Sequence, residues 1–199
     1  MSNSFINAIK NRRSQYVLGK ELPLSQGDAS SLILEAIKLA PSAFNSQSSR
    51  AVVLFDEQSE KFWSFVKDEL RKYVPADSFS GTEQKIDGFS AGAGTVLFYE
   101  DQDVVADLQK QYPVYAENFP VWSEQSSGMA QFAVWTALAT ANIGASLQHY
   151  NPLADLAAAK EWALPPSWKL RAQMPFGANQ AGCGEKRYMD DNTRFRVFA

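Results

Sequence analysis

One stretch of this sequence combines residue types that could bind a flat, uncharged heterocycle: residues 39–50, which read LAPSAFNSQSSR. Pro41 cannot continue a helix and disfavours helical backbone at the residue before it, so a helix should end here. Ser42, Asn45 and Gln47 then offer uncharged donors and acceptors, which suit the edge of a planar ring better than a metal or a phosphate. A simple polar turn between two elements is the competing interpretation, because such loops are common.

Two further clusters are cationic. Arg12, Arg13 and Ser14 follow the first predicted helix, and two adjacent arginines beside a hydroxyl form a compact anion-binding group. Cations at a helix C-terminus also interact favourably with the helix dipole, so this motif has a purely structural interpretation as well. The other cluster is the basic segment 186–196, which contains Lys186 and Arg194. Together, the two cationic clusters and the neutral loop match a ligand with an anionic tail and a flat polar head.

Composition narrows the possible functions. The chain has 199 residues, of which 45% are hydrophobic and 13% aromatic, and this predicts one globular domain over residues 1–199. A net charge of −3 argues against a general nucleic-acid binder. Cys183 is the only cysteine and His149 the only histidine, so we predict no disulfide and no metal site. No signal-peptide pattern and no long apolar run are present, so we expect a cytoplasmic protein that does not enter a membrane.

Helical periodicity predicts the elements that position these clusters. The predicted helices cover residues 4–10, 28–40, 59–73, 101–112, 122–142 and 153–163. The helix at 122–142 is the longest and has almost no charge after Glu124, which predicts burial at a dimer interface or in the core of a monomer.

Apolar runs and alternation predict strands at residues 51–55, 95–99, 145–152, 169–174 and 194–198. The strand at 169–174 alternates and should be half exposed, and the last should carry arginines on one face. Residues 75–94 show no clear pattern, and residues 113–120 are an aromatic segment that is either a mobile lid or a packed loop. Helices and strands alternate without the regularity of a βαβ array. We therefore expect an α+β sandwich with one sheet of four or five strands between two helical layers.

The whole chain resembles the FMN-dependent nitroreductase-like family, and especially its compact, short-chain branch. The resemblance rests on motifs that occur in a fixed order: RRS at 12–14, APSAFNSQ at 40–47, WSEQSSGM at 122–129, GASLQHYNP at 144–152, FG at 176–177 and the tail 185–198. It implies a three-layer sandwich with a mixed, mostly antiparallel sheet, and a homodimer with FMN at its interface. Two features depart from the family pattern and leave acceptor specificity open: Gln47-Ser48-Ser49 replaces a common Gln-Pro-Trp, and the stretch between the second and third strands is short.

The resemblance also assigns roles to individual residues. Arg12 and Ser14 would contact the phosphate and ribityl chain, with Arg13 close by. Lys186 and Arg194 would complete the phosphate site. Pro41, Ser42 and Asn45 of the other protomer would lie against the isoalloxazine. Ala43 and Gln47 of the same loop also belong to the implied cofactor-binding residues. Leu147 and Gln148 would present backbone near the ring, and Gln125 completes the implied cofactor-binding set.

The implied activity is electron transfer from NADPH or NADH to a nitroaromatic, quinone or similar small-molecule acceptor by a ping-pong mechanism. The flavin would carry this chemistry, so no catalytic side chain is predicted. Two alternatives stay open: a flavin-binding regulatory or stress-response module with little turnover, and an apolar-ligand carrier built from the aromatic loop.

Overall fold

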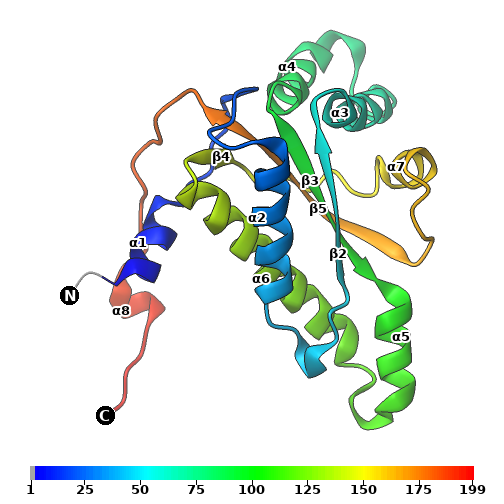
Figure 1. Ribbon diagram of the computed structural model, residues 1–199, viewed down its shortest axis with the longest axis vertical. Coiled ribbons are helices and arrows are strands. Elements are labelled where there is room, and N and C mark those ends of the chain that lie inside the picture. Colours follow the sequence, from blue (N-terminus) through cyan, green and yellow to red (C-terminus); the bar gives the residue numbers. More distant parts are fainter. Residues whose placement is uncertain (1–2) are drawn as a thin grey trace.

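An antiparallel sheet of five strands forms the middle layer of the fold, described here from a computed structural model that places residues 3–199 (Figure 1). The strands are β1 (Leu18–Gly19), β2 (Ser49–Phe55), β3 (Gly94–Asp101), β4 (Ile143–Ala145) and β5 (Trp168–Asn179). They run in the order β1-β5-β3-β2, and β4 also pairs with β5. An isolated parallel bridge joins Ser14 to Ala145 beside this sheet.

Helices cover both faces of the sheet (Figure 1). One layer contains α2 (Gln26–Leu39) and α6 (Phe119–Thr140), with α1 (Ser4–Asn11) packed against α6. The opposite layer contains α3 (Asp56–Leu70), α4 (Phe79–Ser90) and α7 (Asp155–Glu161). At the end of β3 the chain enters α5 (Gln102–Gln111), and α8 (Asp191–Arg194) lies in the C-terminal segment. Short 3₁₀ turns occur at Ala43–Asn45, Ala76–Ser78 and Pro113–Tyr115.

Two hydrophobic clusters hold the three layers together. Because successive side chains of a strand point to opposite faces, Leu97 and Tyr99 pack beneath α3, α4 and α7, whereas Val96 and Phe98 pack beneath α2 and α6. Each large apolar side chain buried in this way contributes roughly 1.5–3 kcal/mol, against about 0–1 kcal/mol for an exposed ion pair. The clusters, rather than the surface salt bridges, therefore fix the framework that carries the site.

The predicted α+β sandwich is confirmed, and all six predicted helices are present with small shifts of their ends. The start of α2 matches its sequence signal, because Ser25 caps the helix and accepts a hydrogen bond from the Asp28 amide. The sequence did not predict α4, since only Phe79, Ile86 and Phe89 of that helix are buried.

Three strand predictions need correction. The strand expected at 169–174 is the longer β5, and it is mostly buried because helices cover both of its faces. The strand expected at 145–152 is only β4, after which a single bridge joins Gln148 to Gln173. The strand expected at 194–198 is wrong: Arg194 ends the short helix α8, and residues 195–199 pair with no strand among the described residues.

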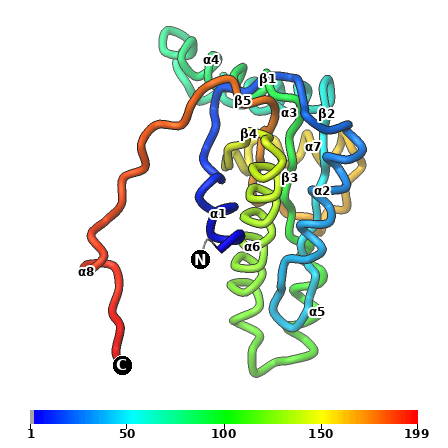
Figure 2. Tube along the Cα trace, turned by 60° about the vertical axis from the view of Figure 1, so that its left-hand side comes forward, coloured from blue at the N-terminus to red at the C-terminus, as the bar shows by residue number. Residues whose placement is uncertain are grey.

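The C-terminal segment after β5 leaves the three layers and extends away from them (Figure 2). All of its side chains from position 179 onward are exposed. Over residues 3–199, no helix combines the length and the apolar character needed to cross a membrane.

Candidate functional site

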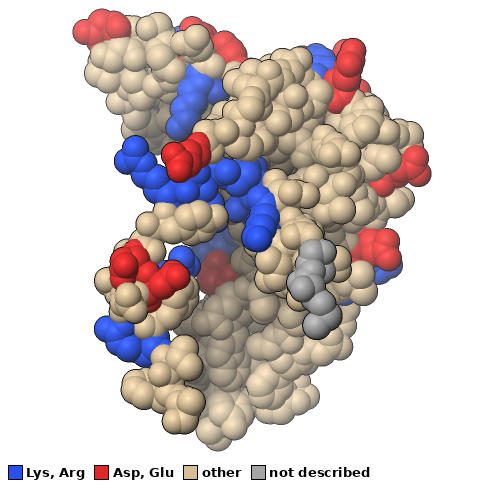
Figure 3. Space-filling model, turned by 90° about the vertical axis from the view of Figure 1, so that its left-hand side faces the viewer, with Lys and Arg blue, Asp and Glu red and all other residues tan. Residues whose placement is uncertain are grey.

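A cationic pocket forms where the segment after α1 meets the C-terminal segment. Its cavity of about 410 Å³ is lined by Arg12, Arg13, Ser14 and Lys186, and by residues of the C-terminal segment that include Gly184 and Glu185. Lys and Arg side chains gather on this face, beside the hollow that the C-terminal segment spans (Figure 3). Guanidinium, hydroxyl and ammonium donors that converge in this way can bind an anionic group such as a phosphate.

Arg12 is held by the end of one helix and the face of another. It caps α1, and its backbone N–H donates to the Ala8 carbonyl at 3.1 Å. Its guanidinium lies over the Trp135 ring of α6, 4.3 Å from the ring centroid. Such a contact is worth about 0.5–1 kcal/mol at an exposed site and limits the rotamers of the arginine. This pairing could not be predicted from the sequence, because Trp135 reads as an ordinary core position.

The C-terminal segment closes the pocket through two contacts that the sequence did not predict. Arg13 donates from Nη2 to the Gly184 carbonyl at 2.7 Å, and Gln15 donates from Nε2 to Cys183 Sγ at 2.5 Å. The backbone of Gln15 is fixed in turn, since its N–H donates to the Ala145 carbonyl at 2.9 Å. The segment 12–15 is therefore anchored to β4 on one side and to the tail on the other.

Arg194 is the one predicted phosphate ligand that the structure does not bring to this pocket within one chain. It is exposed at the end of α8 and lies over the neighbouring Phe195 ring, 5.1 Å from its centroid. Lys186 lines the pocket, while its ammonium lies 5.1 Å from the Tyr188 centroid.

The loop of residues 41–48, called here the carboxamide loop, follows α2 as its sequence predicts. Three of its non-glycine residues have positive φ: Phe44 at 56°, Asn45 at 50° and Gln47 at 49°. Each such residue costs on the order of 1–3 kcal/mol, somewhat less for asparagine, and strain of this kind concentrates at functional sites. Ser42 stabilises the turn, because its carbonyl accepts from the Asn45 amide and its Oγ from the Gln47 amide, both at 3.0 Å.

Helix α6 supports the carboxamide loop from below. Ala43 donates its amide to Ser126 Oγ at 3.4 Å. Pro41, Ser42 and Gln47 line a small cavity of about 200 Å³ together with Ser126. The Asn45 side chain is exposed, and so is that of Gln125 on α6, so both are available to a ligand.

Phe44 connects the carboxamide loop to a cluster of aromatic rings. Its centroid lies 4.9 Å from Tyr112, 5.9 Å from Tyr115, 5.3 Å from Phe119 and 5.9 Å from Trp122. The aromatic segment 113–120 therefore packs against the loop. About half of the Phe44 surface stays exposed, which leaves an aromatic face beside Asn45.

Leu147 and Gln148 lie after β4 in backbone held by β5. The Gln148 amide donates to the Gln173 carbonyl at 2.7 Å, and the Gln173 amide returns a bond to the Gln148 carbonyl at 2.9 Å. Gln173 is fully buried and its Oε1 accepts from the Tyr150 amide at 2.7 Å. Leu147 packs against the core beneath α6.

The cationic pocket and the carboxamide loop lie at different positions along α6 within one chain. Their supports on that helix, Trp135 and Ser126, are separated by nine residues, or about 14 Å of helix at 1.5 Å per residue. The two cavities share no lining residue. One chain therefore presents two separate candidate half-sites, one cationic and one with uncharged donors and acceptors.

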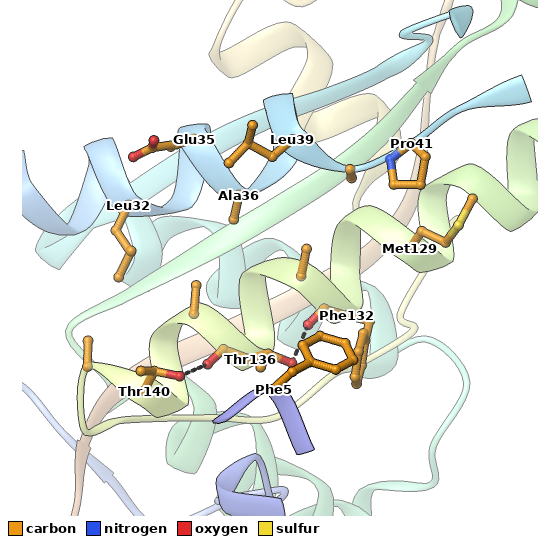
Figure 4. A pocket seen from close by; sticks show the side chains of 14 residues that line it. Phe5, Leu32, Glu35, Ala36, Leu39, Pro41, Met129, Phe132, Thr136 and Thr140 are labelled. Carbon is orange, nitrogen blue, oxygen red and sulfur yellow. Dashed lines mark hydrogen bonds between the residues drawn. The ribbon is translucent and has the colours of Figure 1, made fainter. Parts of the chain in front are cut away.

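Beside the carboxamide loop lies an open apolar groove of about 720 Å³, which shares Ala40 and Pro41 with the small cavity of that loop (Figure 4). Phe5 of α1, Leu32 and Leu39 of α2, and Met129 and Phe132 of α6 line it. Leu39 is 76% exposed and Phe5 61%, although both are large apolar side chains.

This three-layer architecture is that of a nitroreductase-like α+β protein. Residues 9–178 match the model of the Nitroreductase family, and the chain belongs to that family. HBN1 from Saccharomyces cerevisiae is 35% identical over 191 residues, which cover 95% of each chain. The resemblance seen in the sequence is thereby confirmed.

Solved structures agree with this assignment. Structures of nitroreductase CinD from Lactococcus lactis include complexes with chloramphenicol and 4-nitrophenol. The chloramphenicol complex has a TM-score of 0.91 and 48% identity to this protein, and the match covers 98% of this chain and 100% of CinD. A nitroreductase with bound FMN from Desulfitobacterium hafniense is 16% identical and has a TM-score of 0.72, with full coverage of both chains, which shows a common fold.

Proposed function

We propose that this protein is an FMN-dependent oxidoreductase that takes electrons from NADPH or NADH and passes them to a small nitroaromatic, quinone or similar acceptor. The observation that carries the proposal is the pairing of a cationic pocket with a strained carboxamide loop in a chain of the nitroreductase family. The complexes of CinD with chloramphenicol and 4-nitrophenol support a small aromatic acceptor. The FMN bound by the Desulfitobacterium hafniense protein supports the cofactor at the level of the fold.

The donor set of the two half-sites fits FMN. A phosphate dianion would be held by Arg12, Arg13 and Lys186, with the Ser14 hydroxyl close by, through charge-assisted hydrogen bonds. When bound, FMN supplies the two-electron hydride chemistry that no protein side chain can perform. The protein binds and orients it.

The carboxamide loop would serve the ring end of the cofactor. Ser42, Asn45 and Gln47 would offer neutral donors and acceptors to the heteroatoms of the ring, and Leu147 and Gln148 would offer backbone. The half-exposed Phe44 provides an aromatic surface on which a planar acceptor could stack. One open ring face that admits donor and acceptor in turn gives ping-pong kinetics.

A homodimer completes the proposed site. The apolar groove between α2 and α6 leaves large side chains exposed, as an unpaired interface does, and obligate dimers bury about 2,000 Å² or more at such faces. A second copy seated on the groove would bring the carboxamide loop of one protomer toward the cationic pocket of its partner. This arrangement accounts for the separation of the two half-sites in one chain.

The test begins with the absorbance spectrum of the purified protein and ends with stopped-flow mixing. We expect a yellow protein that releases FMN rather than FAD on denaturation, is bleached quickly by NADPH or NADH, and is reoxidised by a quinone. Bound FMN without fast reduction would favour the regulatory module instead. A colourless protein that takes up no added FMN would contradict the proposal.

A further inference from the structure

Glu100 of β3 is a fully buried carboxylate that the proposed function leaves without a role. Its Oε2 accepts hydrogen bonds from Ser48 Oγ at 2.6 Å and from Ser123 Oγ at 2.9 Å. Its Oε1 accepts from Ser49 Oγ at 2.5 Å. Across residues 3–199, Glu100 forms no ion pair with a lysine, arginine or histidine.

A carboxylate in this position is unfavourable unless its surroundings satisfy it. Burial without a cationic partner costs free energy, and hydrogen bonds from neutral donors must offset that cost. A serine hydroxyl has one proton to donate, so each of the three serines commits its proton to Glu100. These serines come from three segments: Ser48 ends the carboxamide loop, Ser49 begins β2, and Ser123 belongs to α6.

Glu100 thereby fastens one end of the carboxamide loop. Through Ser48 and Ser123 it links the end of the loop to α6. The start of the loop is held by the same helix, one turn further along, where Ser126 accepts from the Ala43 amide. All three positive-φ residues of the loop lie between these two attachments. Strained backbone of this kind persists only when the surrounding structure holds it.

Two of the three hydroxyls come from adjacent residues, Ser48 and Ser49, which stand where the sequence resemblance implies Pro-Trp. A proline at position 48 has no side-chain donor and could not bond to Glu100. The Glu100 carboxylate and the hydroxyls of Ser48 and Ser49 therefore form one hydrogen-bonded cluster in this chain.

We propose that Glu100 is a positioning residue that fixes the carboxamide loop, and through it Asn45 and Gln47, against the flavin ring. That the loop contacts a flavin rests on the proposed function. The attachment of the loop itself is a property of this chain and can be measured without any ligand.

The experiment compares Glu100→Gln and Ser48→Ala with a matched control, Ser59→Ala. Glutamine keeps the size of the side chain but replaces one acceptor by an NH₂ group, so at least one serine loses its partner. Ser48→Ala removes a single hydrogen bond to Glu100, so it can serve as the test variant if Glu100→Gln does not fold. Ser59 is equally buried and donates or accepts at 2.8 Å with Thr95 Oγ1, away from the loop.

We expect both test variants to speed hydrogen exchange of the amides at residues 43–47 and to lower FMN affinity. Loss of a hydrogen bond to a charged acceptor corresponds to a fall in FMN affinity of about tenfold to a hundredfold. At saturating FMN, the flavin midpoint potential should shift and reduction by nicotinamide should slow. Ser59→Ala should lower the Tm and leave loop exchange, potential and reduction rate unchanged.

A purely structural role for Glu100 predicts something different. If Glu100→Gln and Ser48→Ala lower only the Tm, as Ser59→Ala does, while loop exchange and potential stay at the wild-type values, the proposal is overturned. If the wild-type protein takes up no FMN, the proposed function is wrong. The exchange data then decide by themselves whether Glu100 holds the loop.

Discussion

Individual side chains divide into those that should hold the phosphate and one that should tune the ring. Arg12→Ala or Lys186→Ala removes a charge-assisted bond worth roughly 1.5–3 kcal/mol, so FMN affinity should fall about tenfold to a hundredfold. Asn45→Ala removes a neutral contact and should weaken binding less, but it should change the reduction rate more. FMN titration and single-turnover reduction of the three variants measure this crossover. Normal reduction of saturated Asn45→Ala would show that Asn45 has been given the wrong role.

Asp155 gives a residue-scale prediction that does not involve the ligand. Desolvation raises the pKa of its carboxyl above the ordinary value of 3.8, although Arg171 and Lys169 pull it down. Among the described residues, its buried Oδ1 also lacks a hydrogen-bond partner. A raised pKa in the folded state means that the protonated form contributes stability below pH 3.8, and that this contribution is lost as the pH rises through the raised value.

Asp155→Asn resembles the protonated side chain at every pH. We therefore expect it to unfold at a higher temperature than the wild type at pH 7, and the difference to disappear below pH 3.8. Thermal denaturation followed by circular dichroism at several pH values measures this. The exposed Asp77→Asn is the control and should change little. Lower stability of Asp155→Asn at pH 7 would mean that the carboxylate has a favourable partner.

Among the elements, those with strong periodicity or composition could be predicted from the sequence, and those defined by their partners could not. The length and the lack of charge of residues 122–142 predict helix α6, and Pro41 predicts the end of α2. Helix α4 has too few apolar residues to show a period. The alternation after Arg194 suggested a strand, but within residues 3–199 of one chain no neighbouring strand is available to pair with it. Alternation describes a strand's side chains and says nothing of its partner.

The same limit applies to the site. The hydroxyls, carboxamides and arginines could be selected by chemistry and family motif, because local sequence fixes a turn or a helix end. Contacts between distant residues, such as Arg12 with Trp135 or Ser48 with Glu100, could not be derived from the sequence. They depend on where the fold places α6 and β3 relative to the loops. Glu100 in particular reads as the polar end of an apolar strand.

The C-terminal segment is the element whose removal separates binding from folding. Its side chains from position 179 onward are exposed and belong to neither hydrophobic cluster, yet Lys186 and Gly184 line the cationic pocket. A chain that stops after Ala181 should keep its far-UV circular dichroism spectrum and lose FMN affinity by about tenfold or more, because Lys186 is removed. Lys186→Ala in the full chain is the matched control. Unchanged FMN affinity of the truncated chain would exclude the segment from the pocket.

At the scale of the whole molecule, the apolar groove predicts the oligomeric state. Phe132 lies in the groove on α6 and is 38% exposed, so Phe132→Glu would place a charge in the proposed interface. Burial of an unpaired charge costs several kcal/mol, which should convert the dimer to monomers at micromolar concentration. Light scattering measures the mass. Leu156→Glu on α7, in the opposite helical layer, is the control, because Leu156 is 88% exposed and should tolerate the charge. A wild-type monomer with FMN bound would contradict the proposed dimer.

Whether each site draws on both protomers can be decided by mixing two defective proteins. Arg12→Ala homodimers should lose FMN on desalting, and Asn45→Ala homodimers should retain it but react slowly. If the cationic pocket of one protomer faces the carboxamide loop of its partner, a mixed dimer has one site with neither substitution and one with both. After random exchange of subunits, about a quarter of all sites should then both retain FMN and be reduced quickly. If each site lies within one chain, every site in the mixed dimer carries one substitution, and no fast-reacting site that retains FMN should appear.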